Sequence, residues 1–70
     1  MNYEDFKKEI ENAINTRRKS WRKGQAVFNY IDDNYSVARD VQFKDNVDCF
    51  YDDTRIESFV RLAFKRINAI

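Results

Sequence analysis

Residues 20–35 read SWRKGQAVFNYIDDNY, and this stretch decides the fold. Its largest apolar residues and its glycine recur at steps of three and four, at Trp21, Gly24, Phe28, Ile31 and Tyr35. At 100° per residue, these positions share one side of a helix within about 80°. The spacing therefore predicts a central helix over residues 20–35, against which the other helices pack, and Ser20 is its expected N-cap.

The composition of the chain indicates one small helical domain over residues 1–70. Pro is absent, Gly occurs once, and six Phe, four Tyr and one Trp supply large side chains. A domain of this size buries only about 60% of the surface that its unfolded chain exposes, so a core rich in aromatic residues is expected. The scarcity of Pro and Gly is typical of helices joined by short connections.

A first helix is predicted over residues 2–18. Its apolar stripe consists of Tyr3, Phe6, Ile10, Ala13 and Ile14. The basic residues 17–19 lie near its end, where positive charge favours the helix dipole. No Pro or Gly separates this helix from the central one, so a continuous helix is an alternative. We favour a break, because the first helix is already long.

The second half of the chain predicts a short helix and a final amphipathic helix. Ser36 is the expected cap of the short helix, residues 44–48 form a loop, and Phe50 with Tyr51 is expected to fill the space beneath it. Asp53 or Thr54 begins the final helix, and Thr54 with Glu57 matches a capping box. The final stripe consists of Ile56, Phe59, Val60, Ala63, Phe64, Ile67 and Ile70 and spans about 140°. The expected fold is all-α and compact, with about four helices that are long, medium, short and medium.

Charge is unevenly distributed along the chain, although the formal net charge is only +1. Residues 1–31 hold seven basic and four acidic groups, residues 32–53 hold two and seven, and residues 54–70 hold four and one. This asymmetry permits an electrostatic partner without identifying it. No apolar run approaches the length of a membrane span, and the single Cys49 excludes an internal disulfide. We expect a cytoplasmic protein without membrane contact.

The residue types argue against enzyme chemistry. The absence of His removes the commonest general base and transition-metal ligand, and one Gly cannot form a phosphate-binding loop. The acidic residues are Asp45, Asp48, Asp52 and Asp53. Their spacing does not match an EF-hand, and capping or loop roles fit them better. We therefore expect no enzyme activity, no metal site and no cofactor.

The densest basic patch surrounds the only Trp. It consists of Arg17, Arg18, Lys19, Arg22 and Lys23, with Trp21 in its middle. Cations interleaved with an aromatic side chain can bind phosphates and stack on a base, which makes this patch a candidate nucleic-acid site. In the simpler interpretation, which we favour, Trp21 belongs to the core and the cations cap a helix end.

Three apolar residues lie outside the predicted stripes. Ala26 and Tyr30 share the far side of the central helix, and Leu62 lies about 160° from the middle of the final stripe. Either these helices are buried on two sides or the residues belong to a binding surface. The candidate partner-binding residues are Tyr30, Leu62, Arg61 and Lys65.

Two segments carry a resemblance. Residues 21–31 contain Trp-Arg-Lys-Gly-Gln followed by Phe-Asn and Ile, and residues 48–59 contain Asp-Cys-Phe-Tyr before Arg-Ile and Phe. Over about residues 18–60 the chain resembles a group of small uncharacterised helical proteins of phages and bacteria. Their pattern has Pro where this chain has Cys49. The resemblance implies a phage or mobile-element origin, and thus the host cytoplasm, but no activity.

These features predict a non-catalytic helical protein of phage type that binds a host or phage protein. The alternative is nucleic-acid binding through the basic patch. Self-association also stays open, because a second copy often completes the core of a small domain. Within the fold, we expect Gly24 to allow close approach of another helix, and Gln25 and Asn29 to hydrogen-bond the backbone of residues 44–52.

Overall fold

A computed structural model of the chain describes residues 1–42, 49–50 and 52–69. The helices are α1 (Tyr3–Asn15), α2 (Lys23–Tyr35), α3 (Ala38–Gln42) and α4 (Ile56–Asn68), and a 3-10 turn, η1 (Asp53–Arg55), directly precedes α4. No strand occurs in these ranges. The predicted all-α domain of about four helices is confirmed, although α1, α2 and α4 each have 13 residues.

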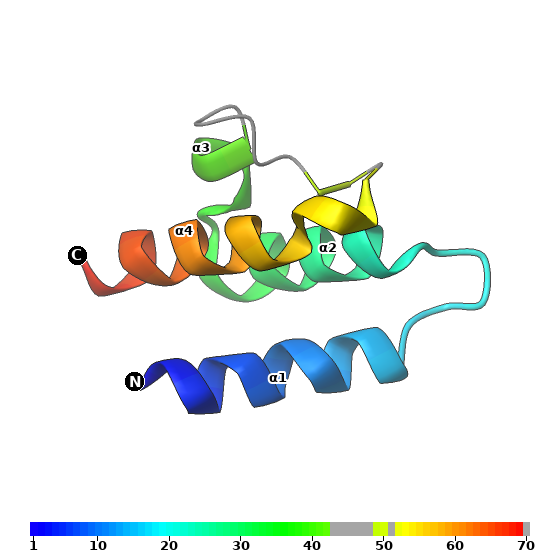
Figure 1. Ribbon diagram of the computed structural model, residues 1–70, viewed down its shortest axis with the longest axis horizontal. Helices are drawn as coiled ribbons and strands as arrows, with labels where there is room; N and C mark the ends of the chain where they lie inside the picture. The colour runs from blue at the N-terminus through cyan, green and yellow to red at the C-terminus, as the bar shows by residue number, and fades with distance from the viewer. Residues whose placement is uncertain (43–48, 51, 70) are drawn as a thin grey trace.

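The helices pack around two central members. Helices α2 and α4 lie side by side, α1 runs antiparallel to both, and α3 lies across the opposite side of the pair (Figure 1). Helix α2 contacts every other helix, as predicted for residues 20–35, but α4 does so as well, whereas α1 and α3 do not meet. The domain is thus organised around the α2–α4 pair.

The core is built from residues of every helix, from Val37 just before α3 and from Cys49. Its buried side chains are Phe6, Ile10, Ala26, Val27, Phe28, Ile31, Val37, Ala38, Val41, Cys49, Phe59, Val60 and Ala63. Ala26 is buried on the far side of α2 from Phe28, so α2 is buried on two sides. Phe64 is only half-buried, and its ring packs edge-on against Tyr3 at 5.1 Å. Ile70 lies outside the described residues.

The break between the first two helices is confirmed, but both ends differ from the prediction. Helix α1 stops at Asn15, and α2 begins at Lys23 after Arg22 rather than after Ser20. The backbone N–H of Trp21 donates to the carbonyl of Arg18 at 3.0 Å, which closes a turn in the connection. Trp21 therefore precedes the helix instead of lying on its face.

Gly24 is buried where the chain returns from α3. A Cβ at this position would lie 1.8 Å from the carbonyl oxygen of Cys49. The Gly24 N–H donates to the Asp53 carboxylate at 2.9 Å, and the Cys49 thiol donates to the Gly24 carbonyl at 3.5 Å. Close approach at Gly24 was predicted, but the approaching segment is the backbone at Cys49 and not a helix.

Two predicted caps perform other roles. Ser36 adopts the left-handed conformation with φ 58° and ends α2, because its N–H donates to the carbonyls of Ile31 and Asp32. The capping box of Thr54 with Glu57 is wrong. Asp52 caps η1 instead, accepting from the Thr54 N–H at 3.0 Å. The Thr54 hydroxyl donates to the same carboxylate, and this bond, followed by the bond from the N–H, lowers the pKa of the Asp52 carboxyl.

The segment before η1 is described only in part. Phe50 is half-buried and packs edge-on against Phe28 with ring centroids 5.4 Å apart. The predicted loop at 44–48 and Tyr51 lie outside the described residues.

Candidate binding surfaces

A narrow apolar groove runs between α1 and α4. Its volume is about 150 Å³. Its lining residues are Tyr3, Lys7, Ile10, Glu11, Ile14, Ile56 and Val60. The two helices contact each other less closely than either contacts α2, so their facing stripes do not fully close. We call this feature the α1–α4 groove.

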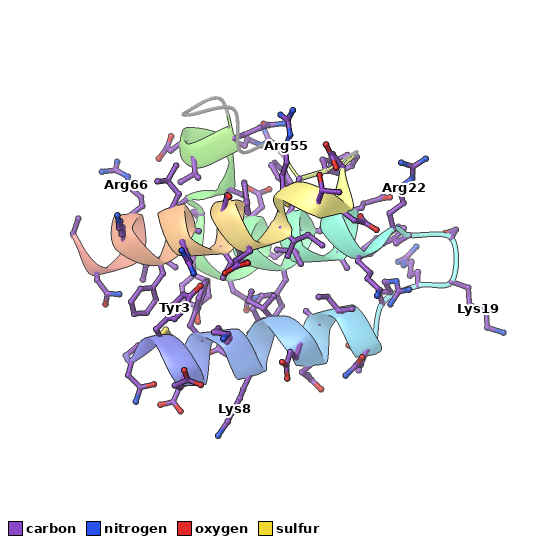
Figure 2. All side chains as sticks on the ribbon, in the orientation of Figure 1. Tyr3, Lys8, Lys19, Arg22, Arg55 and Arg66 are labelled. Atoms are coloured by element: carbon purple, nitrogen blue, oxygen red, sulfur yellow. The ribbon has the colours of Figure 1, made fainter. Side chains whose placement is uncertain are left out.

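An open hollow of about 360 Å³ continues the groove at one end. It is lined by Tyr3, Phe64, Arg61 and Lys65, and Tyr3 belongs to both features. Tyr3 lies between the two helices at the N-terminal end of α1 (Figure 2). The hollow thus brings together two predicted partner-binding residues, Arg61 and Lys65, with two aromatic rings.

The other two predicted partner-binding residues are part of the core periphery. Tyr30 and Leu62 are half-buried and pack against the buried cluster. Of the large hydrophobic residues that the structure describes, only Met1 is exposed, at 57%. Tyr30 and Leu62 therefore form no protruding apolar patch. Sequence periodicity could not reveal this, because it does not show what lies opposite each side of a helix.

Tyr30 and Tyr35 both bind one carboxylate. Their hydroxyls donate to Oε1 of Glu9 at 2.8 Å and 2.6 Å, which ties α1 to α2. Burial, followed by the hydrogen bond to Glu9, raises the pKa of both phenols above the usual value. The neutral phenols are the hydrogen-bond donors, so this cluster has a structural role at neutral pH.

The basic patch divides into one structural residue and several exposed ones. Arg17 donates from Nη1 to the carbonyl of Ile14 at 2.7 Å and from Nε to that of Trp21 at 3.1 Å. It therefore caps the end of α1, as the simpler interpretation predicted. Arg18, Lys19, Arg22 and Lys23 are exposed.

Trp21 does not belong to the core, contrary to that same interpretation. It is half-buried and lies outside the buried cluster and the apolar residues packed on it. The guanidinium carbon of Arg18 lies 5.4 Å from its ring centroid, within the range of a cation–π contact. The Trp instead borders a surface cleft.

This cleft, the Trp21 cleft, has a volume of about 290 Å³. It lies between the end of α1, the connection and the outer face of α2. The lining residues are Ala13, Thr16, Arg17, Arg18, Trp21, Ala26, Asn29, Tyr30, Asp33 and Asn34. Asn29 lines this cleft. It was predicted, with Gln25, to bond the backbone of residues 44–52, of which 44–48 and 51 lie outside the described residues. Neither its amide nor that of Gln25 bonds to the described residues of that segment, 49, 50 and 52.

The sequence identified every apolar residue of the α1–α4 groove but assigned all of them to the core. One signal was available. The final stripe spans an arc of about 140°, which is wider than one neighbouring helix covers, so part of it was free to line a groove.

Comparisons of the chain with protein-family models, with curated proteins and with solved structures found no match. The resemblance to small phage and bacterial proteins therefore stays a prediction. Over the described residues, no helix has both the length and the apolar character needed to cross a bilayer.

Proposed function

We propose that this protein binds another protein by accepting an amphipathic helix of the partner in the α1–α4 groove. The observation that carries the proposal is the half-buried apolar strip of Tyr3, Ile14 and Ile56, which lines the groove along the facing sides of two helices. An apolar groove between helices is a recurrent receptor for the apolar face of a partner helix.

The dimensions of the groove suit a short helix. Its α1 wall extends from Tyr3 to Ile14, which corresponds to about 17 Å of helix or about three turns. A standard interface covers about 800 Å² of each partner, about a sixth of the 4846 Å² surface of this chain. The groove and its hollow offer less than this, so a weak, reversible complex is expected.

The charges around the hollow favour acidic residues in the partner. Arg61 and Lys65 are the charged residues that line it, and Lys7 lies 5.6 Å from the ring centroid of Tyr3. Arg61 already pairs with Glu57 at 2.8 Å. Lys7 and Lys65 have no ion pair with any described residue. Carboxylates at one end of a docked helix would pair with these two lysines.

Two synthetic peptides would test the proposal. Both carry leucines at helical spacing, and the flanking positions are glutamates in one and lysines in the other. We expect the acidic peptide to shift the backbone amide resonances of α1 and of residues 56–65 in the isotope-labelled protein. The basic peptide should bind about tenfold or more weakly, because Lys7 and Lys65 repel it.

Matched variants separate charge from general loss of fold. Lys7→Gln with Lys65→Gln should weaken binding of the acidic peptide, whereas Lys8→Gln should not, because Lys8 points away from α4 (Figure 2). Circular dichroism checks that the variants fold. The proposal fails if the peptide shifts other amides or none. It also fails if sedimentation shows that a second copy of the chain occupies the groove.

A further inference from the structure

Trp21 is the residue whose position folding does not explain. Burial of a Trp side chain is among the largest apolar contributions to a core, yet this one lies on the connection between α1 and α2, outside the core. Arg17 bonds the carbonyl of Trp21 and so fixes the backbone that carries the ring. The ring is held in place at the surface, beside a cleft.

The Trp21 cleft matches one planar ring in size and lining. Its volume of about 290 Å³ is at the lower end of small-molecule pockets, which are typically about 300–1,000 Å³. Asn29 contributes a half-buried amide that bonds no side chain or backbone group of the described ranges. Asp33, an exposed residue, also lines the cleft. Amides and carboxylates recognise base edges, and a carboxylate accepts from the amino group of cytosine.

Cations lie at the cleft and on the connection beside it. Arg18 lies against Trp21, and Lys19 and Arg22 are exposed on the connection, where both point outward (Figure 2). Proteins that bind single-stranded nucleic acid combine aromatic rings, on which bases stack, with cations that follow the phosphates. A paired base in a duplex does not offer its face or its pairing edge to such a cleft.

We infer that the Trp21 cleft binds one unpaired base of single-stranded nucleic acid, while the adjoining phosphates contact Arg18 and Lys19. Arg17 holds the connection and does not contact phosphate. The Asp33 carboxylate favours a base with an amino group, so cytosine binds more tightly than thymine. This site is separate from the α1–α4 groove.

The single Trp makes binding directly observable. Titration with a short deoxycytidine oligomer at low salt should quench its fluorescence, and a deoxythymidine oligomer of equal length should bind more weakly. Trp21→Leu should lower the affinity for a dye-labelled oligomer about tenfold or more. Arg18→Gln with Lys19→Gln should reduce the slope of log affinity against log salt by about 1.4.

Three controls define the site. Lys8→Gln removes a cation on the far side of α1 and should leave the affinity unchanged. Asp33→Asn should abolish the preference for cytosine. Lys7→Gln with Lys65→Gln should leave oligomer binding unchanged but weaken binding of the acidic peptide. Failure of this proposal can therefore be distinguished from failure of the groove proposal. Circular dichroism confirms folding of each variant.

Several outcomes would overturn the inference. Absence of quenching at low salt would remove the site. If the folded Trp21→Leu variant bound the oligomer as tightly as the wild type, the attraction would be by charge alone. Equal affinity of the wild type for duplex and single strand would show the same. Equal binding of deoxycytidine and deoxythymidine oligomers would show that no base enters the cleft. If deoxycytidine monophosphate bound as tightly as the oligomer, the ligand would be a free nucleotide and not a strand.

Discussion

At Gly24, the absence of a side chain lets two backbone segments meet. The carbonyl oxygen of Cys49 occupies the space that a Cβ would need, and the Cys49 thiol donates to the Gly24 carbonyl. The opposing atom belongs to the backbone and not to the end of a flexible side chain. Any larger residue must therefore displace the segment at Cys49 from α2.

We predict that Gly24→Ala lowers the free energy of unfolding by about 2 kcal/mol. Overpacking at a rigid contact costs about 3 kcal/mol, and the better helix propensity of Ala offsets about 1 kcal/mol of it. Gly24→Leu should cost more. Gly24→Asn should also destabilise, because φ is not positive here. Urea unfolding followed by circular dichroism measures all three, and a more stable Ala variant would contradict the contact.

At the scale of the elements, the start of α2 depends on a residue far away in the sequence. The side chain of Arg22, the N-cap, makes no capping hydrogen bond to the first turn of α2. The Asp53 carboxylate instead accepts from the Gly24 N–H, and its charge lies at the positive end of the α2 dipole. Asp52 caps η1. Two adjacent aspartates therefore cap two different elements.

We predict that Asp53→Ala lowers the free energy of unfolding by about 1 kcal/mol, because a first-turn N–H of α2 loses its acceptor. Asp53→Asn should cost less, since its amide oxygen can still accept. Hydrogen exchange should accelerate at the Gly24 amide in the Ala variant. In the control, Asp52→Ala, exchange should accelerate at Thr54 instead. Faster exchange confined to residues 54–58 in Asp53→Ala would contradict the assignment.

At the scale of the whole molecule, the free energy of unfolding depends on how firmly α1 is attached to α2. A domain of this length has about 4–10 kcal/mol of unfolding free energy in total. The two phenol hydrogen bonds to Glu9 join α1 to α2 and therefore contribute a substantial part of this free energy. Both bonds need protonated phenols, which makes the domain sensitive to alkaline pH.

We predict that wild-type stability falls as the pH rises above about 10, the usual phenol pKa in the unfolded chain. Burial, and after it the hydrogen bond to Glu9, raises the pKa of Tyr35 in the folded state. Folding therefore favours the protonated phenol, and the stability that Tyr35 contributes is complete only below the pKa of the unfolded chain. Tyr35→Phe should be less stable at neutral pH and lose less stability above pH about 10. Thermal melts across this range test it, with Tyr3→Phe as a control outside the cluster. Parallel curves for Tyr35→Phe and wild type would contradict the linkage.

The sequence by itself determined the helices and their inward stripes. Periodic apolar residues, the scarcity of Gly and the absence of Pro act locally, and they predicted four helices, the break before α2 and the close contact at Gly24. The two-sided burial of α2 was one of the two interpretations that the apolar pattern offered.

Tertiary structure decided the caps and the surfaces. Asp53 and Gly24 are 29 residues apart, so no local signal could assign that cap. The position of Trp21 depends on where α2 begins. Whether a stripe residue such as Ile14 or Ile56 is enclosed or lines a groove depends on how closely α1 approaches α4. These outcomes follow from contacts between distant segments, since periodicity fixes which side of a helix is apolar but not how much of that side a neighbour covers.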